Sequence, residues 1–293
     1  MSGALLAAAS GVGFGVFQSI NGRALRGTDD SYASTFVQVG TAAMALAAVA
    51  LAAGELDGVL EAPLWALGDF AFAGLLHFLA GWSLLNLSQH RIGAARTGPL
   101  LTTVPVFGVV IAALTIGQLP GAVTLLAIAL MCAGAYLVAM RGGGATARAA
   151  DALPALGCAL MWALSPIFIL RGLEGFDSPV AGLTVGLVVS VLAFAPALVL
   201  FRGAGPAWTA VKASAGTLKL IAGVLVAVAT WSRWAALEDA AVGAVLALNL
   251  LSVPTVLFLA PIIAGRHVER VTLGLWTGAG LVISGGLVLV VAP

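Results

Sequence analysis

Residues 179–201 read PVAGLTVGLVVSVLAFAPALVLF, a run without a single charged side chain. An α-helix rises about 1.5 Å per residue, so about 20 predominantly apolar residues span the roughly 30 Å hydrocarbon core of a bilayer. This stretch therefore predicts a helix that crosses a membrane.

Nine further stretches satisfy the same condition, and loops rich in turn-forming residues separate most of them. Gly27-Thr28-Asp29-Asp30 and Arg202-Gly203-Ala204-Gly205-Pro206 are two such loops. We therefore expect an all-α integral membrane protein with ten transmembrane helices, at residues 4–22, 32–53, 64–88, 94–116, 121–140, 152–171, 179–201, 215–236, 241–264 and 270–291.

The composition leads to the same fold class. Hydrophobic residues make up 61% of the 293 residues and charged residues 9%, whereas an average soluble domain is about 25% charged. The net charge of +1 and the scattered basic residues exclude the electrostatic surface that nucleic-acid binding needs. Cys132 and Cys158 lie in apolar runs without metal-ligand spacing, so we expect neither a metal site nor a cofactor.

The two halves of the chain resemble each other. A shift of 149 residues aligns Trp82-Ser83 with Trp231-Ser232, and Val104-Pro105 with Val253-Pro254. We expect a first repeat of five helices at 1–140, a connecting loop at 141–151 and a second repeat at 152–293. Because five is an odd number, the second repeat must insert upside down relative to the first.

The basic residues support this inversion. The loop at 54–63 carries three acidic and no basic residues, whereas its counterpart at 202–214 carries two basic residues. Of the thirteen Lys and Arg residues, only Arg171 and Arg233 fall on the acidic side of the predicted bundle. The basic side is expected in the cytoplasm, which predicts both termini in the periplasm of a bacterial inner membrane.

Several motifs in order carry a family resemblance. RIGAARTGP at 91–99, VPVF at 104–107 and AGAYL at 133–137 resemble the end of the repeat in EamA-type carriers of the drug/metabolite transporter superfamily. LGCALMWALS at 156–165 resembles the start of the second repeat in that family. Within the superfamily the chain looks most like bacterial amino-acid and metabolite exporters of the YddG-like branch, which implies a small-molecule substrate and a carrier that works as a monomer in the lipid bilayer.

Two positions depart from the family pattern. Gly117-Gln118 stands where the family often has Gly-Glu before the fifth helix, and the second copy reads Gly265-Arg266-His267. A role that depends on that acidic residue therefore does not transfer to this chain.

The resemblance implies a central cavity lined by helices 1, 3, 4, 6, 8 and 9. Polar groups at membrane depth tend to face a cavity or a partner helix. The polar and tryptophan side chains of these six helices are therefore the candidates for the cavity wall. The candidate substrate-binding residues are Gln18, His77, Trp82, Asn86, Thr103, Trp162, Ser165, Trp231, Arg233, Asn249 and Ser252.

Each candidate also has a structural interpretation. A hydroxyl can bond to its own helix, and His77 can be a structural, substrate-binding or protonatable group. The tryptophans can pack in the core or stack on an aromatic or cationic substrate. Arg233 can extend to the membrane surface or meet a substrate carboxylate.

Pro105 and Pro254 fall at equivalent positions of the two repeats and are candidate hinges, because each interrupts its helix. No Asp or Glu lies in the middle of a predicted helix, so a proton antiporter built on a buried carboxylate is not indicated.

The sequence favours an alternating-access exporter of amino acids, of aromatic or hydrophobic type, and related metabolites. A drug or toxic-cation exporter is the alternative. A channel is less favoured because an inverted repeat is typical of carriers, and a membrane enzyme is less favoured because no catalytic cluster appears.

Overall fold

The computed structural model describes residues 3–116, 119–141, 149–240, 245, 248–267 and 269–291. Throughout these residues the regular structure is helical and no β-strand occurs, as expected for an all-α membrane protein. Gly117-Gln118, which departs from the family pattern, and most of the loop at 141–151 lie outside the described residues.

The helices of the first half are α1 (Gly3–Leu25), α2 (Ser31–Ala52), α3 (Leu64–Gly74), the π-helix η2 (Leu75–Gly81), α4 (Trp82–Ile92), α5 (Ala94–Leu101), α6 (Val104–Ile116) and α7 (Ala122–Arg141). Those of the second half are α8 (Leu153–Gly175), α9 (Pro179–Arg202), α10 (Ala204–Ser214), α11 (Thr217–Asp239), α13 (Ser252–Ala264) and α14 (Leu273–Val291). Two short 3-10 turns, η1 (Asp57–Leu60) and η3 (Ala149–Ala152), precede α3 and α8.

Eight of the described helical spans are long and apolar enough to cross a membrane. The predicted third helix is one of them, but it is built from α3, η2 and α4 in succession. α13 and α14 are apolar but shorter, so ten crossings stay a prediction. The prediction for residues 202–214 was wrong in one respect, because most of this connector forms the helix α10.

The helix ends follow from local chemistry. Asp30 caps α2 by accepting the backbone N–H groups of Tyr32 and Ala33 at 3.0 and 2.9 Å. Gly93 and Gly203 have φ near +82° and +81° and allow the sharp turns between α4 and α5 and between α9 and α10.

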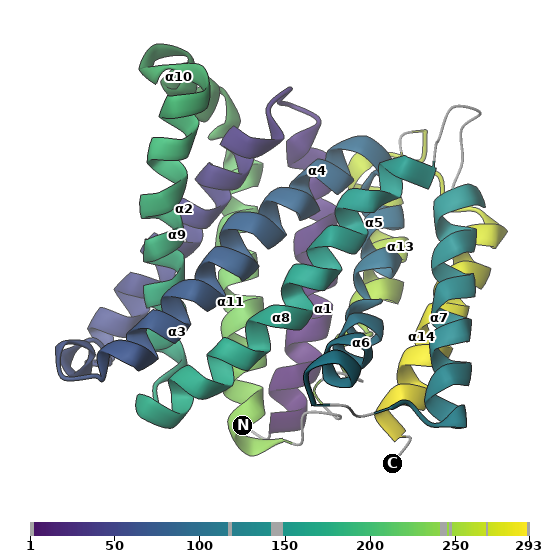
Figure 1. The fold of residues 1–293 in the computed structure, drawn as a ribbon. Helices are drawn as coiled ribbons and strands as arrows, with labels where there is room; N and C mark the ends of the chain where they lie inside the picture. The colour runs from purple at the N-terminus through teal and green to yellow at the C-terminus, as the bar shows by residue number, and fades with distance from the viewer. Residues whose placement is uncertain are drawn as a thin grey trace.

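The helices form one bundle in which elements of the two halves alternate (Figure 1). α1 packs on α11 and α13, α8 packs on α3, and α9 contacts both α2 and α3. α7 and α14 form a pair at one side of the bundle. In Figure 1 both chain ends lie at the lower edge and α10 lies at the upper edge, and we call these the terminal end and the α10 end.

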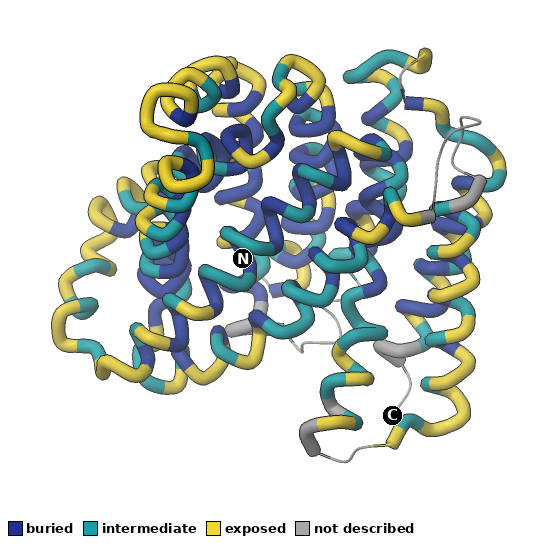
Figure 2. Tube along the Cα trace, turned by 45° about the horizontal axis from the view of Figure 1, so that its top comes forward, coloured by how far each residue is buried: buried dark blue, intermediate teal, exposed yellow. Residues whose placement is uncertain are grey.

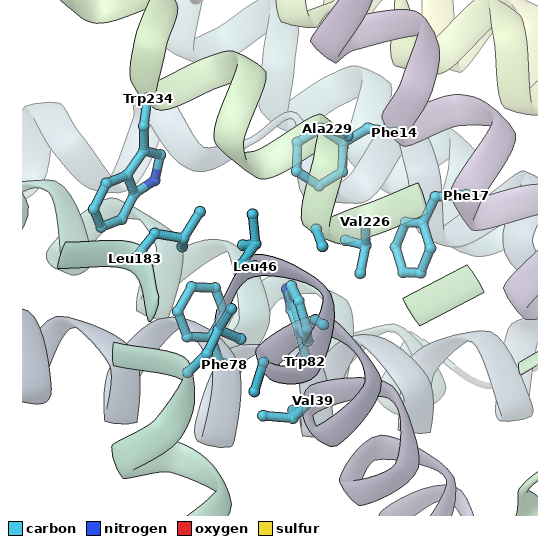
Figure 3. Close-up of a cluster of buried hydrophobic side chains, with 14 of the residues drawn as sticks. Phe14, Phe17, Val39, Leu46, Phe78, Trp82, Leu183, Val226, Ala229 and Trp234 are labelled. Carbon is cyan, nitrogen blue, oxygen red and sulfur yellow. The ribbon is translucent and has the colours of Figure 1, made fainter. Parts of the chain in front are cut away.

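Aromatic and aliphatic side chains from several helices fill the interior (Figure 3). Phe78 and Trp82 of the third span pack edge to face with ring centroids 4.9 Å apart. Figure 2 shows exposed residues on the outer faces of the helices, and many of them are apolar, such as Leu200, Phe201 and Leu114. This pattern suits a bundle whose outer surface faces lipid.

Glycine allows the closest helix contacts. A Cβ atom added to Gly74 of α3 would lie 2.2 Å from the carbonyl oxygen of Gly186 in α9. One added to Gly134 of α7 would lie 2.5 Å from the carbonyl oxygen of Gly278 in α14. Small residues at such crossings are typical of helices that associate within a membrane.

Candidate functional site

A cavity of about 170 Å³, measured as the space open to the centre of a water-sized sphere, lies between helices of the two halves. That space exceeds many times the roughly 10–15 Å³ that one water needs by the same measure. The walls are mostly apolar, and the lining side chains come from α1, the α5–α6 segment, α8, α11, residues 245, 249, 250 and 252, and α14.

α1 contributes Phe14 and Gln18 to the wall. Both are buried, and the Oε1 atom of Gln18 has no hydrogen-bond partner. A buried carbonyl oxygen without a donor is unfavourable, so the Oε1 atom of Gln18 is an available acceptor in the cavity wall.

Trp162 of α8 forms another part of the wall and is held from behind by the third span. The indole ring stacks on the imidazole of His77 with centroids 5.2 Å apart and planes 11° apart. Its Nε1 group donates to the backbone carbonyl of His77 at 3.4 Å, and the Nδ1 atom of His77 lies 2.9 Å from the hydroxyl of Ser165. His77 and Ser165 therefore fix the orientation of Trp162 and do not themselves line the cavity.

Arg233 of α11 brings a positive charge to this apolar wall. Its guanidinium lies over the ring of Phe14, with Cζ 5.6 Å from the ring centroid, a cation–π arrangement. Neighbouring Trp234 also lines the cavity, and its buried Nε1 donor has no partner. The lining residues in the described part of the chain include no Asp or Glu.

The remaining predicted residues in the wall are Asn249, Ser252 and Pro105. Asn249 donates to the backbone carbonyl of Val245 at 3.0 Å. Pro105 lies in the first turn of α6, directly after the break at 102–103 that separates it from α5.

Other predicted site residues lie away from the cavity. Trp82 is fully buried in the core, Thr103 is bonded to the carbonyl oxygen of Leu100, and Trp231 points outward with 36% of its surface exposed. Pro254, the proposed partner hinge of Pro105, lies in α13 and is absent from the lining.

Asn86 belongs to a second polar group, near the α10 end, which the sequence interpretation missed. We call it the Lys219 cluster, and it comprises Asn21, Thr35, Gln38, Asn86, Gln89 and Lys219 from α1, α2, α4 and α11. All six side chains are buried.

The bonds inside the Lys219 cluster are short and interlocked. The Nζ atom of Lys219 donates to Asn21 Oδ1 at 2.5 Å, Gln38 Oε1 at 2.7 Å and Asn86 Oδ1 at 3.4 Å. Asn21 donates to Asn86 and Gln89, both at 2.6 Å, and so ties α1 to α4. The sequence signal was a set of polar residues near the same ends of four predicted helices.

A carboxylate adds further polar bonds at the α10 end. Glu269, in the loop after α13, is buried and pairs with Arg26 at 3.0 Å. It also accepts the backbone N–H of Ala94 at 3.0 Å, at the start of α5, where a negative charge is favourable. The α10 end is therefore held together by polar bonds between the two halves.

Among the described residues no three His, Cys, Asp or Glu side chains gather where they could hold a metal ion. The cavity supplies apolar surface, aromatic faces, one cation and a few hydrogen-bonding groups. Apolar and aromatic walls with a few polar groups are typical of pockets for small molecules.

Comparison with known proteins identifies the family. Residues 1–140 match the EamA-like transporter family. A solved structure, described only as a crystal structure of a protein, has the same fold, with a TM-score of 0.61 and 19% sequence identity over 96% of this chain and 94% of that one. No curated protein matches. On this match and the apolar helical spans, residues 1–140 belong to the EamA-like transporter family of the drug/metabolite transporter superfamily, and the chain is a multi-pass membrane transporter.

Proposed function

We propose that this transporter exports small metabolites that carry an acidic group on an apolar body, above all hydrophobic or aromatic amino acids. The observation that supports this most directly is Arg233 in the wall of an otherwise apolar cavity. A guanidinium binds a carboxylate through charge-assisted, often bidentate hydrogen bonds.

The other groups of the wall suit the rest of an amino acid. The unpartnered Oε1 atom of Gln18 accepts a hydrogen bond from an ammonium group. Phe14 and Trp162 offer aromatic faces to an apolar or aromatic side chain.

The main alternative is export of drugs or toxic cations. The aromatic faces alone would suit a cation. However, Arg233 repels one, and the described lining offers no Asp or Glu to neutralise it. The balance of charge therefore favours an acidic substrate.

Transport by alternating access follows from two inverted repeats, which we propose at residues 1–140 and 152–293. The helix pairs support this division. α1, the first helix of one half, packs on α11, while α8, the first helix of the other half, packs on α3 and η2, the corresponding span. α7 and α14, the last helices of the two halves, pack on each other. Pro105 and Pro254 are the proposed hinges of this motion.

A counterflow experiment tests the function. Liposomes containing the purified protein and loaded with unlabelled L-phenylalanine should accumulate labelled L-phenylalanine transiently, at a rate that saturates with concentration. Protein-free liposomes are the control. Uptake that does not saturate would indicate a channel, and counterflow of phenethylamine without counterflow of L-phenylalanine would establish the cation exporter instead.

We propose that the α10 end faces the cytoplasm of a bacterial inner membrane and that both chain ends are periplasmic. Arg26, Arg91 and Lys212 lie at the α10 end, and basic residues favour the cytoplasmic side. A periplasm-specific reporter fused after Pro293 should be active, and one inserted after Gly205 in α10 should be inactive. The reverse pair of results would overturn the orientation.

A further inference from the structure

Lys219 brings an ammonium group into the Lys219 cluster, and joining the helices does not require this charge. Lys219 is 2% exposed, and in the described part of the chain its ammonium forms no ion pair with a carboxylate. Burying a cation among neutral groups is unfavourable, and a neutral side chain could join the same helices without that penalty. A charged residue buried within a membrane bundle generally marks a functional site.

The cluster also has more donors than it uses. The Nε2 atoms of Gln38 and Gln89 are buried and have no acceptor. With the ammonium of Lys219 they provide one positive charge and unused N–H groups in one place. A carboxylate needs a cation and several donors around its two oxygens.

Lys219 and Arg233 stand on one face of the same helix. Both belong to α11, and their separation of fourteen residues (233 − 219) corresponds to nearly four turns, about 21 Å along the axis. Arg233 lines the cavity, and Lys219 lies near the α10 end of α11, where polar bonds join the helices. The two cations are thus placed at successive depths along one helix that contacts both halves.

We propose that Lys219, with Gln38 and Gln89, is a second binding site for the substrate carboxylate, occupied when the α10 end opens. In the structure described above, the amide oxygens of Asn21 and Asn86 take the place of the carboxylate oxygens. When α1 and α4 separate from α11, Lys219 loses these acceptors and a carboxylate replaces them. This inference depends on the proposed function, because it concerns the same substrate.

The lysine content of the chain makes a direct test possible. Lys212 and Lys219 are the only lysines, and Lys212 lies exposed on α10. In a Lys212→Arg variant, Lys219 is the only side-chain amine. Membrane vesicles that present the α10 end to the medium are treated with a membrane-impermeant amine reagent, and labelling of Lys219 is followed by mass spectrometry of its peptide.

We expect slow labelling of Lys219, because the α10 end opens during transport. L-phenylalanine at ten times its half-saturating concentration should slow the labelling roughly tenfold, as occupancy of one site predicts. L-phenylalaninamide, which lacks the carboxylate, should not. Protection by L-phenylalanine should persist in an Arg233→Gln background, where the cavity site is weakened.

Complete absence of labelling under transporting conditions would make the Lys219 cluster a permanent structural element and overturn the proposal. Protection that disappears with Arg233→Gln would overturn it too, because the substrate would then act through the cavity alone. These results are separable from failure of the proposed function, which appears as absence of saturable L-phenylalanine counterflow in the unmodified protein.

Transport by substituted proteins provides a second measurement. Lys219→Met retains most of the side-chain volume but removes the charge, and it should raise the half-saturating concentration at the α10 end about tenfold or more. Lys219→Arg should restore most of the affinity. If the two variants behave alike, or if Lys219→Met leaves the half-saturating concentration unchanged, the charge has no role in binding.

Discussion

Replacing Arg233 with glutamine should selectively weaken the binding of carboxylates. A hydrogen bond to a charged group contributes about 1.5–3 kcal/mol, and 1.4 kcal/mol corresponds to about tenfold in affinity. Because the wall around Arg233 is mostly apolar and its described lining holds no Asp or Glu, little else compensates for the lost cation. We expect binding of 3-phenylpropionate to weaken about 10- to 150-fold.

The assay is a titration of the purified protein with 3-phenylpropionate and with 3-phenylpropionamide. Arg233 also lies over the ring of Phe14, and loss of this contact should change the affinity for the acid and for the amide equally. The difference between the two losses of affinity therefore measures the interaction of Arg233 with the carboxylate. Arg171→Gln is the matched control, since Arg171 is exposed and lies 3.5 Å from Asp69, outside the cavity lining. Equal losses for acid and amide, or no loss for the acid, would refute the assignment of Arg233 as the anchor.

Two further substitutions test the packing and the aromatic wall. Gly74→Ala places a Cβ atom 2.2 Å from the carbonyl oxygen of Gly186 and should destabilise the folded protein by about 1–3 kcal/mol, seen as a lower melting temperature in detergent. Gly68→Ala, with nothing within 4 Å of its added Cβ, should leave the melting temperature unchanged or slightly raised, and equal effects would contradict the steric argument. Trp162→Ala should reduce the preference for L-phenylalanine over L-alanine by about two- to tenfold in competition assays, since stacking contributes about 0.5–1.5 kcal/mol. Trp162→Phe should retain most of that preference, and an unchanged preference in Trp162→Ala would place the aromatic substrate elsewhere.

Part of the cavity wall could be predicted from polarity at membrane depth. Large polar or tryptophan side chains in apolar helices need a partner or a cavity, which predicts Gln18, Trp162, Arg233 and Asn249 as site residues, and all four line the cavity. The same reasoning could not separate them from Trp231, which points outward. Repeat alignment pairs Trp231 with Trp82 but contains no information on which face of a helix is turned inward.

Lys219 shows a different limit of the sequence. A lysine near a helix end is ordinarily expected to extend to the membrane surface, and the count of thirteen Lys and Arg residues places Lys219 on the basic side without indicating a buried cluster. Its partners lie 181 and 198 positions away in Gln38 and Asn21. A contact of this kind requires the three-dimensional arrangement of α1, α2 and α11, for which local patterns carry no signal.

The π-helix at Leu75–Gly81 determines the direction in which α4 faces. A π turn uses one residue more than an α turn, and each extra residue turns the following helix by about 100° around its axis. Asn86 and Gln89 lie beyond this segment and reach α1 and α11 only in the present angular setting. The segment that presents His77 to Trp162 thus also sets the direction in which α4 presents Asn86 and Gln89 to the Lys219 cluster.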